Sequence, residues 1–144
     1  MKKISAFVLA ILAAVSMSAC SSKEPAQDTS LDDVLSKGEI TVAISPDFAP
    51  SEFKDPNTGE ILGSDVYVAQ YVADYLSKKY DKEINLKIEE MDFKTCQAAV
   101  QAGTVDFSVN GFAATEDRKE NFYITSHYGK TRSSSTSYQG LLIN

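Results

Sequence analysis

The sequence predicts an α/β lobe of three layers, in which a mainly parallel sheet lies between helices. Beyond residue 38, segments typical of strands take turns with segments of helical periodicity, in the order β, α, β, α, β, α, β. Of the 144 residues, 43% are hydrophobic and 24% are charged, as in folded globular domains. The part that follows the N-terminal leader, about 110 residues, suffices for one modest core.

Residues 1–19 are expected to be a secretory signal peptide. Lys2 and Lys3 precede the apolar run "AFVLAILAAVSMSA", which is short for a membrane span and ends on small residues. A retained N-terminal anchor helix is the alternative. "MSAC" resembles the lipobox of bacterial lipoproteins, which implies that Cys20 carries lipid such as palmitate after cleavage. Residues 20–30 are small and polar and would serve as the tether.

The charge of the mature chain limits its partners. Loss of residues 1–19 reduces the 14 basic residues to 12 against 20 acidic ones, a formal charge of −8. Neither a nucleic acid nor an anionic membrane surface is therefore expected as a partner. With Cys20 lipidated, Cys96 is the one remaining cysteine, which excludes a disulfide framework. We expect Cys96 to be a small buried side chain rather than a reactive thiol.

Residues 30–37 are expected to form a short helix, because Ser30 is a suitable N-cap and Gly38 a suitable stop. Residues 39–44, "EITVAI", are apolar and β-branched, which predicts a buried strand. Residues 45–60 are rich in Pro, Asp, Asn and Gly. A long loop is therefore expected directly after the first strand, a place where function often resides.

Residues 64–79 have the periodicity of a helix. Apolar residues recur at three- and four-residue steps and predict a buried stripe: Val66, Ala69, Val72, Ala73 and Leu76. Tyrosines recur at four-residue steps and predict a second stripe, half-buried by packing rather than used for a ligand: Tyr67, Tyr71 and Tyr75.

A second strand and helix follow. Residues 84–91 alternate apolar and polar side chains, which predicts a strand. Asp92 is then a good N-cap, and Gly103 a stop. One face of the helix between them is apolar, with Phe93, Cys96 and Val100.

The last predicted elements are short. Residues 105–111 predict a third strand, and 122–128 ("FYITSHY") a fourth strand or extended piece. Thr115 is expected to cap a helix over 115–121. In a parallel sheet, ligands bind beyond the carboxyl ends of the strands. Three segments should meet there: the loop from Ser45, the Asp92–Phe93 turn and the Asn110–Thr115 turn.

The sequence lacks the motifs that are typical of phosphate-binding loops, redox or metal sites and serine hydrolases. The chain has no glycine-rich phosphate loop, no CxxC, no HExxH and no GxSxG. A single histidine, His127, cannot build a zinc site, and we expect it to be packed or solvated rather than a catalytic base. Neither a metal nor a cofactor is expected, and the chain is not expected to be an enzyme.

Arg118 stands where a cation is unfavourable, in the first turn of the predicted helix over 115–121. Its planar guanidinium matches a carboxylate bidentately, so an anionic ligand would relieve the unfavourable placement. The alternative is a surface ion pair with an acid of the same helix: Glu116, Asp117 or Glu120.

From Glu39 to Tyr128 the chain resembles the family-3 solute-binding proteins of bacterial amino-acid ABC transporters, which have the type II periplasmic-binding-protein fold. "LDDVLSKGEITVAISPDFAP" is similar to the opening helix, first strand and ligand loop of the family, and "GSDVYVAQYVADYL" to its first long helix. "DFKTCQAAVQAGTVDFSVNGFAATEDRKENFYITSHY" is similar to its longest signature. These blocks occur in the family's order, behind a lipobox.

The resemblance implies roles for individual residues. Arg118 matches the arginine that grips the α-carboxylate of the bound amino acid. Phe48 and Phe93 match the aromatic positions that flank the ligand side chain. From the residues alone, Phe48 is equally a loop aromatic tucked against the core. Phe93 would be shared between core and cleft.

Three further positions are implied at the strand end. Asn110, Gly111 and Ala113 match positions that offer backbone groups to the ligand, although Asn110 by itself reads as a polar strand end satisfied by backbone. Many relatives have Ser or Thr where Ala113 stands. Relatives selective for cationic side chains often have an acid where Ser45 stands, which argues against a lysine- or arginine-specific site, although Asp47 and Glu52 lie close by.

The family implies a monomer, anchored by lipid outside the cytoplasmic membrane, that captures an amino acid and delivers it to an ABC permease. Residues 31–130 would form the first lobe, and 131–144 the crossover toward an absent second lobe, with "SYQGLLI" as an unpaired strand. The 144-residue chain is then expected to bind weakly or not at all. The alternatives are an enzyme of the same fold (a dehydratase or a lytic transglycosylase) and a ligand-sensing domain.

Overall fold

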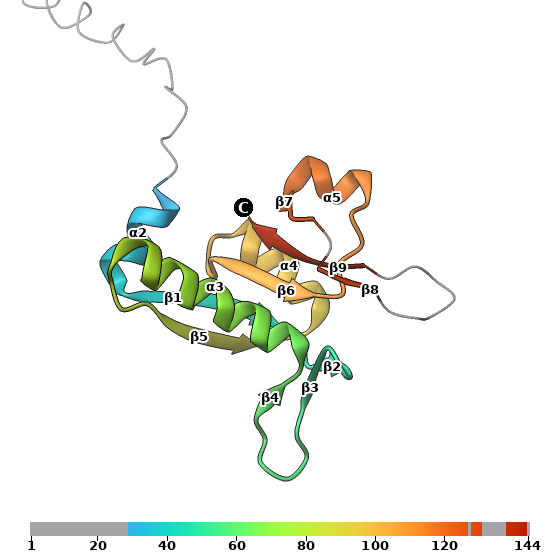
Figure 1. Ribbon diagram of the computed structural model, residues 1–144. Coiled ribbons are helices and arrows are strands. Elements are labelled where there is room, and N and C mark those ends of the chain that lie inside the picture. Colours follow the sequence, from blue (N-terminus) through green and yellow to red (C-terminus); the bar gives the residue numbers. More distant parts are fainter. Residues whose placement is uncertain (1–28, 127, 131–137, 144) are drawn as a thin grey trace, which may run out of the picture.

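The computed structural model describes residues 29–126, 128–130 and 138–143 (Figure 1). The predictions for the signal peptide, for the Cys20 lipid anchor and for His127 lie outside these residues. Within the described ranges, no helix is both long enough and apolar enough to span a membrane.

The predicted α/β lobe is confirmed, with a mixed sheet of six strands in the order β5-β1-β6-β9-β7, and with β8 paired to β9. The strands are β1 (Glu39–Ile44), β5 (Asn85–Glu90), β6 (Phe107–Asn110), β7 (Tyr123–Ile124), β8 (Gly129–Lys130) and β9 (Tyr138–Ile143). β1 runs parallel to β5 and β6. β9 runs antiparallel to both β6 and β7, so β7 points the same way as β6.

The expectation of an unpaired strand near the C-terminal end is wrong. β9 lies inside the sheet, where Ser108 pairs with Leu142 on one side and Ile124 pairs with Leu142 on the other. Leu141 and Leu142 are buried, Leu142 completely. The segment therefore completes the sheet of this lobe, and the boundary predicted at residues 130/131 divides elements that belong together.

Helices cover both faces of the sheet in three layers (Figure 1). These are α2 (Ser30–Lys37), α3 (Ser64–Tyr80) and α4 (Phe93–Gln101), while α5 (Glu116–Asn121) buries no side chain and lies next to β7. The alternation of β1 shows how the layers form: Val42 and Ile44 pack with α2 and α3, whereas Ala43 packs with Cys96 of α4. Cys96 is buried, as predicted, and burial raises the pKa of its thiol.

Most of the predicted helix ends are confirmed. The Asp92 carboxylate accepts from the Lys94 and Thr95 N–H groups, and the Thr115 hydroxyl accepts from the Arg118 N–H. Gly38 ends α2 in the left-handed conformation, with φ 66°. Ser30 is the first residue of α2 rather than its N-cap, which is Thr29.

The segment predicted as a loop over 45–60 contains a small antiparallel sheet that projects from the lobe (Figure 1). Its strands are β2 (Asp47–Phe48), β3 (Glu52–Lys54) and β4 (Ile61–Leu62). Strands of two or three residues are too short to show a period in the sequence. The turn between β3 and β4 forms as its composition predicts, with the Asp55 carboxylate accepting from the Asn57 N–H at 2.7 Å.

The tyrosine stripe of α3 is not half-buried, which corrects the prediction. Tyr67, Tyr71 and Tyr75 are 78%, 69% and 50% exposed. Ala69 and Ala73, both fully buried, define the inner face of the helix. At 3.6 residues per turn, Tyr67 and Tyr71 lie about 200° around the helix from Ala69, on the opposite face.

Candidate functional site

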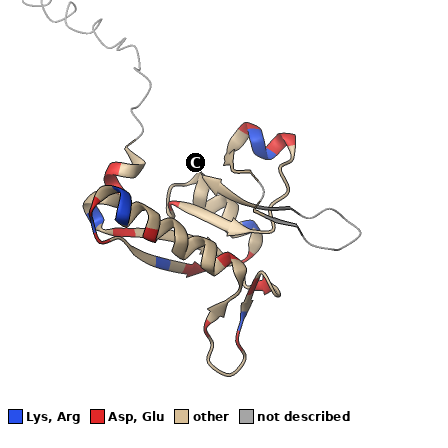
Figure 2. Cartoon of the chain, in the orientation of Figure 1, with Lys and Arg blue, Asp and Glu red and all other residues tan. Residues whose placement is uncertain are grey.

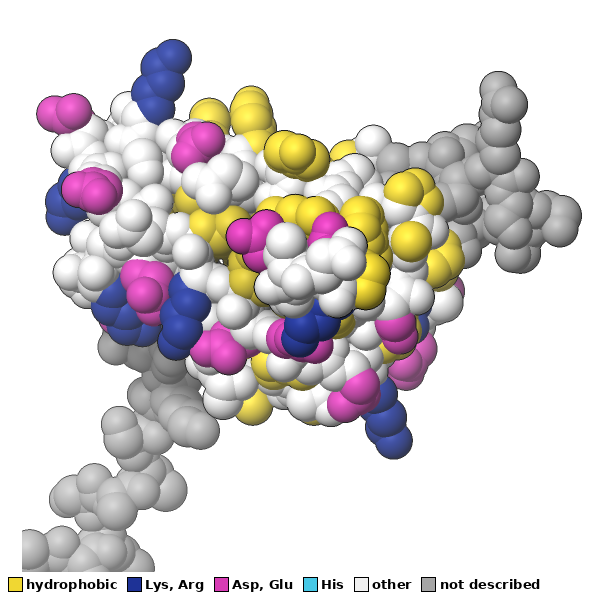
Figure 3. All heavy atoms as spheres, turned by 90° about the horizontal axis from the view of Figure 1, so that it is seen from below, with side chains coloured by type: hydrophobic (Ala, Val, Ile, Leu, Met, Phe, Trp, Pro, Cys, Tyr) yellow, Lys and Arg dark blue, Asp and Glu magenta, His cyan; other side chains and the backbone are white. Residues whose placement is uncertain are grey.

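A hollow of about 150 Å³ opens at the carboxyl ends of the parallel strands. It is lined by Asp47, Phe48, Glu52, Phe93 and Gly111. These residues come from all three segments that the parallel order predicts to meet. Figure 3 views the molecule from the side on which the β2–β4 sheet projects, where hydrophobic side chains gather with acidic side chains among them. The hollow is smaller than a typical ligand pocket of about 300–1,000 Å³, so it would cover one side of a small ligand.

Arg118 is not among the residues that line this hollow, but its guanidinium contacts the ring of Phe93, which is. Its Nε donates to Gln97 Oε1 at 3.2 Å, and Nη1 donates to the Ala113 carbonyl at 2.9 Å. The guanidinium carbon stands 5.6 Å from the centroids of both the Phe93 and the Phe112 rings, a cation–π arrangement. A neutral amide, a carbonyl and two rings therefore fix the guanidinium.

Arg118 forms no ion pair with an acid in the described part of the chain. Basic and acidic residues adjoin along α5 (Figure 2), but Glu116 pairs with Lys119 at 2.7 Å. The surface ion pair considered from the sequence is therefore not formed with the acids of this helix. The dipole argument also weakens, because α5 has six residues and Arg118 stands as near its end as its start.

The aromatic residues form one wall of the hollow. Phe48 is 39% exposed, so it is not tucked against the core, and an added Cβ on Gly111 would stand 3.7 Å from its ring. Phe93 is half-buried and packs against the buried Phe112, with ring centroids 4.9 Å apart. Phe93 thus belongs to both the core and the hollow.

The side chain of Asn110 is used inside the protein. It is fully buried, its Oδ1 accepts from the Ser45 N–H at 2.8 Å, and its Nδ2 donates to Ser108 Oγ at 2.7 Å. These bonds join the carboxyl ends of β1 and β6. Asn110 therefore sets the spacing of the strand ends, as the reading of a satisfied polar strand end suggested.

Ala113 and Gly111 offer backbone groups that already have partners. The Ala113 carbonyl accepts from Arg118 Nη1 and from the Thr115 N–H, both at 2.9 Å. The Gly111 N–H donates to the Glu52 carboxyl. The Ala113 carbonyl thus helps to position the Arg118 side chain.

Two buried carboxyl groups stand behind the hollow. Glu52 on β3 is 1% exposed and Asp65 on α3 is 0% exposed, and their side chains hydrogen-bond to each other. Burial, the contact with Asp65 and the charge of Asp47 raise the pKa of Glu52 to about 9. Burial also raises the pKa of Asp65, and burial together with the charge of Asp65 raises the pKa of Tyr128, which hydrogen-bonds Asp65. Sequence reasoning missed Asp65, although it lies four residues before Ala69 on the buried stripe, where an acid is out of place.

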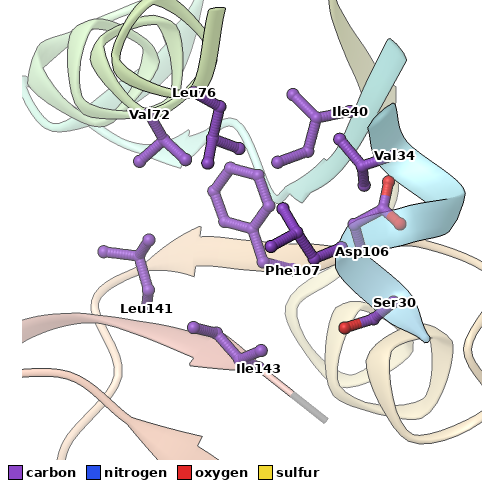
Figure 4. Close-up of a pocket in the computed structure, with 10 residues that line it drawn as sticks. Ser30, Val34, Ile40, Val72, Leu76, Asp106, Phe107, Leu141 and Ile143 are labelled. Atoms are coloured by element: carbon purple, nitrogen blue, oxygen red, sulfur yellow. The ribbon is translucent and has the colours of Figure 1, made fainter. Parts of the chain in front are cut away.

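A second, apolar hollow of about 250 Å³ lies at the amino ends of the strands. Figure 4 shows the Phe107 ring among Ile40, Val72 and Leu76, with Leu141 close by. Asp106 is its one charged lining residue, and the Asp106 carboxylate accepts from the Thr41 N–H at 2.7 Å. This hollow therefore has no cationic lining residue with which to bind a ligand carboxylate.

In the described part of the chain, no group of three or more His, Cys, Asp or Glu side chains is placed to hold a metal ion. At the carboxyl ends of the parallel strands, the site therefore consists of the hydrogen-bonded Arg118 guanidinium, the wall of Phe48 and Phe93, and the buried acids Glu52 and Asp65.

Comparison with solved structures places this arrangement among amino acid binding proteins. The arginine-bound form of domain 1 of TmArgBP matches with a TM-score of 0.67 and 30% identity, over 78% of this chain and 85% of that one. The AbpA protein of Streptococcus pneumoniae, bound to L-arginine, matches with a TM-score of 0.61 and 31% identity, over 69% of this chain and 40% of that one.

Curated relatives agree. The arginine-binding protein ArgT of Corynebacterium glutamicum is 34% identical over 86 residues, which are 60% of this chain and 26% of ArgT. The probable ABC transporter extracellular-binding protein YckB of Bacillus subtilis is 32% identical over 118 residues, 78% of this chain and 38% of YckB. The chain thus spans between about a quarter and two fifths of the length of these relatives. Residues 40–139 match the bacterial extracellular solute-binding proteins of family 3, and the chain belongs to that family.

Proposed function

We propose that this lobe captures an amino acid outside the cytoplasmic membrane, for delivery to an ABC permease. The observation that carries the proposal is the placement of Arg118, held by Gln97 and the Ala113 carbonyl beside the hollow. A guanidinium has five N–H donors, and these two bonds leave others for a ligand carboxylate. The rings beneath the guanidinium exclude water on one side, which strengthens an ionic contact.

The ligand would lie between Arg118 and the aromatic wall. Its carboxylate binds the guanidinium, and its side chain runs between Phe48 and Phe93. Backbone groups at Gly111 and Ala113 line the path, and Asn110 keeps the strand ends at the right spacing. Without a hydroxyl at Ala113, the ligand ammonium has one acceptor fewer here than in relatives with Ser or Thr.

We propose an amino acid with a positively charged side chain as the ligand. Asp47 and Glu52 line the hollow, and no basic residue is among its lining residues. Two relatives, ArgT and ArtP of Bacillus subtilis, are named as arginine-binding, and solved relatives hold arginine. Ser45 lacks a charge, but its hydroxyl donates to Asp47 at 3.2 Å, which brings a carboxylate to the same turn.

The family description places its members outside the cell, and the relatives are described as binding proteins rather than enzymes. We propose that the chain is a monomeric lipoprotein held at the membrane through Cys20. Replacing Cys20 with Ala should release the protein from the membrane fraction into the medium or periplasm. Continued sedimentation with membranes would point to retention by residues 1–19 instead.

We further propose that the described lobe binds its ligand alone, but more weakly than a two-lobed relative does. Domain 1 of TmArgBP has been solved in an arginine-bound form, which supports binding by one lobe. The hollow covers only one side of a ligand, which leaves its other side in water and weakens each ionic contact.

Titration of the protein with the twenty amino acids, followed by backbone NMR shifts, tests the proposal even at millimolar affinity. Arginine or lysine should perturb residues around Phe93, Gly111 and Arg118. Arg118→Ala should weaken binding by about thirtyfold or more, since a charge-assisted pair is lost. The neighbouring Lys119→Ala, which removes an exposed cation, is the matched control and should change affinity less than about twofold. Equal effects of the two variants would contradict the role of Arg118.

A further inference from the structure

The Glu52 carboxyl lies in contact with a second buried acid, an arrangement that is favourable only if one of the two carries a proton. One interaction is clear, because the Gly111 N–H donates to this carboxyl. Its Oε2 atom is buried and finds no hydrogen-bond partner in the described part of the chain. The Glu52 and Asp65 carboxyls contact each other, and two carboxylates in contact repel unless one is protonated. A proton on Glu52, donated to Asp65, turns the repulsion into a hydrogen bond.

The Glu52–Asp65 pair has no cation among the described groups that face it from neighbouring elements. Asp47 on β2 adds negative charge, and Ser64 Oγ donates to Asp65 at 3.3 Å. Tyr128 hydrogen-bonds Asp65. The ion pairs formed by the described residues do not include Glu52. Glu52 is thus an acid without a cationic partner on the wall of the proposed ligand site.

We propose that Glu52 and Asp65 share one proton in the ligand-free lobe, and that a positively charged ligand side chain displaces this proton to solvent, so that capture and proton release are linked. The inference rests on the proposed function. It assigns to Glu52 the recognition of side-chain charge, while Arg118 recognises the carboxylate.

The physical basis is the exchange of one positive charge for another. A guanidinium close to the buried Glu52 carboxyl stabilises its carboxylate form and lowers its pKa from the value of about 9. By linkage, each unit by which the ligand lowers this pKa corresponds to about tenfold tighter binding to the ionised site. A neutral side chain of the same shape cannot displace the proton. The pair would therefore discriminate charge as well as shape.

Arginine and citrulline form the matched ligands for the test, because they share shape and α-ammonium group but differ in side-chain charge. Side-chain carboxyl carbons of the ¹³C-labelled protein are followed by NMR from pH 5 to 10, without ligand and with either ligand in excess. Glu52→Gln assigns the Glu52 signal. We expect the pKa of Glu52 to fall by about one unit or more with arginine, and to change little with citrulline.

A second measurement uses affinity. Between pH 6 and 8.5 the affinity of the protein for arginine should rise several-fold, whereas in Glu52→Gln it should be lower and independent of pH. Glu60→Gln, an exposed substitution of the same kind before β4, should behave as the unmodified protein.

The outcomes separate the two proposals. Binding of arginine with an unchanged Glu52 signal, or an equal shift with citrulline, would overturn the proton linkage and leave the binding function standing. If no amino acid binds, the proposed function falls, and the linkage falls with it.

Discussion

Replacing Glu52 with Gln should stabilise the lobe at neutral and alkaline pH, even without ligand. Gln keeps the shape of the side chain, an acceptor for the Gly111 N–H and a donor for Asp65. It differs in that it can never lose a proton. The comparison therefore isolates the cost of holding Glu52 protonated in the folded state.

The magnitude follows from the pKa of Glu52, which rises from 4.5 in the unfolded chain to about 9 in the folded one. At a pH between these two pKa values, Glu52 keeps its proton in the folded chain but has lost it in the unfolded chain. The free energy of unfolding therefore falls as the pH rises, by about 1.4 kcal/mol per unit for one proton. At pH 7.5, three units above the lower value, the cost reaches about 4 kcal/mol, a large part of a typical domain stability of about 5–15 kcal/mol.

Urea unfolding followed by circular dichroism at pH 5, 6, 7 and 8 measures this cost. The stability of Glu52→Gln should exceed that of the unmodified protein by a margin that grows with pH and vanishes near pH 4.5. Glu60→Gln, exposed on the same projecting sheet, should leave the slope unchanged. Parallel pH profiles for the unmodified protein and Glu52→Gln would refute the reasoning, as would a Glu52→Gln variant less stable at pH 8.

Two further substitutions test the scaffold of the site. Asn110→Ala leaves the buried Ser45 N–H without its acceptor and should lower the free energy of unfolding by about 2 kcal/mol. The control Asn121→Ala removes an exposed hydrogen bond to the Asp117 carbonyl and should lower it by about 0.5 kcal/mol or less. Equal losses in urea unfolding would contradict the role of Asn110. Gly63→Ala places a Cβ 2.1 Å from the Ser51 carbonyl at φ 128° and should cost about 3 kcal/mol or more. At Gly59, with φ 75° and no atom within 4 Å of the added Cβ, substitution by Ala should lower the free energy of unfolding by about 1 kcal/mol. Equal stability of the two variants would contradict the steric clash expected at Gly63.

The parts of the fold that could be predicted are those that rest on local patterns. The limits of β1 follow from its β-branched run, and the caps at Asp92 and Thr115 follow from side chains that suit the ends of helices. β2, β3 and β4 could not be predicted, because strands of two or three residues have no measurable period. The pairing of β9 with β6 and β7 joins residues at least 18 positions apart, as between Ile124 and Leu142, which no local pattern reveals.

The candidate site likewise has one part that could be predicted from the sequence and one part that could not. Arg118 stands out in the sequence because a cation is unfavourable in the first turn of the predicted helix, and the structure shows the amide, carbonyl and rings that hold it. The Glu52–Asp65 pair was missed because its two members lie in different elements and each looks ordinary alone. The signal that could have revealed it is helical phase: Asp65 occupies the stripe that Ala69 and Ala73 bury.

The position of β9 has a consequence for synthesis on the ribosome. Because β9 separates β6 from β7, a nascent chain that ends before residue 138 can pair β5, β1 and β6 but cannot join β7 to them. Both flanking strands then offer open hydrogen-bonding edges to other chains. The interval between translation of Ile124 and release of Ile143 is thus the time when a chaperone would matter most for this lobe.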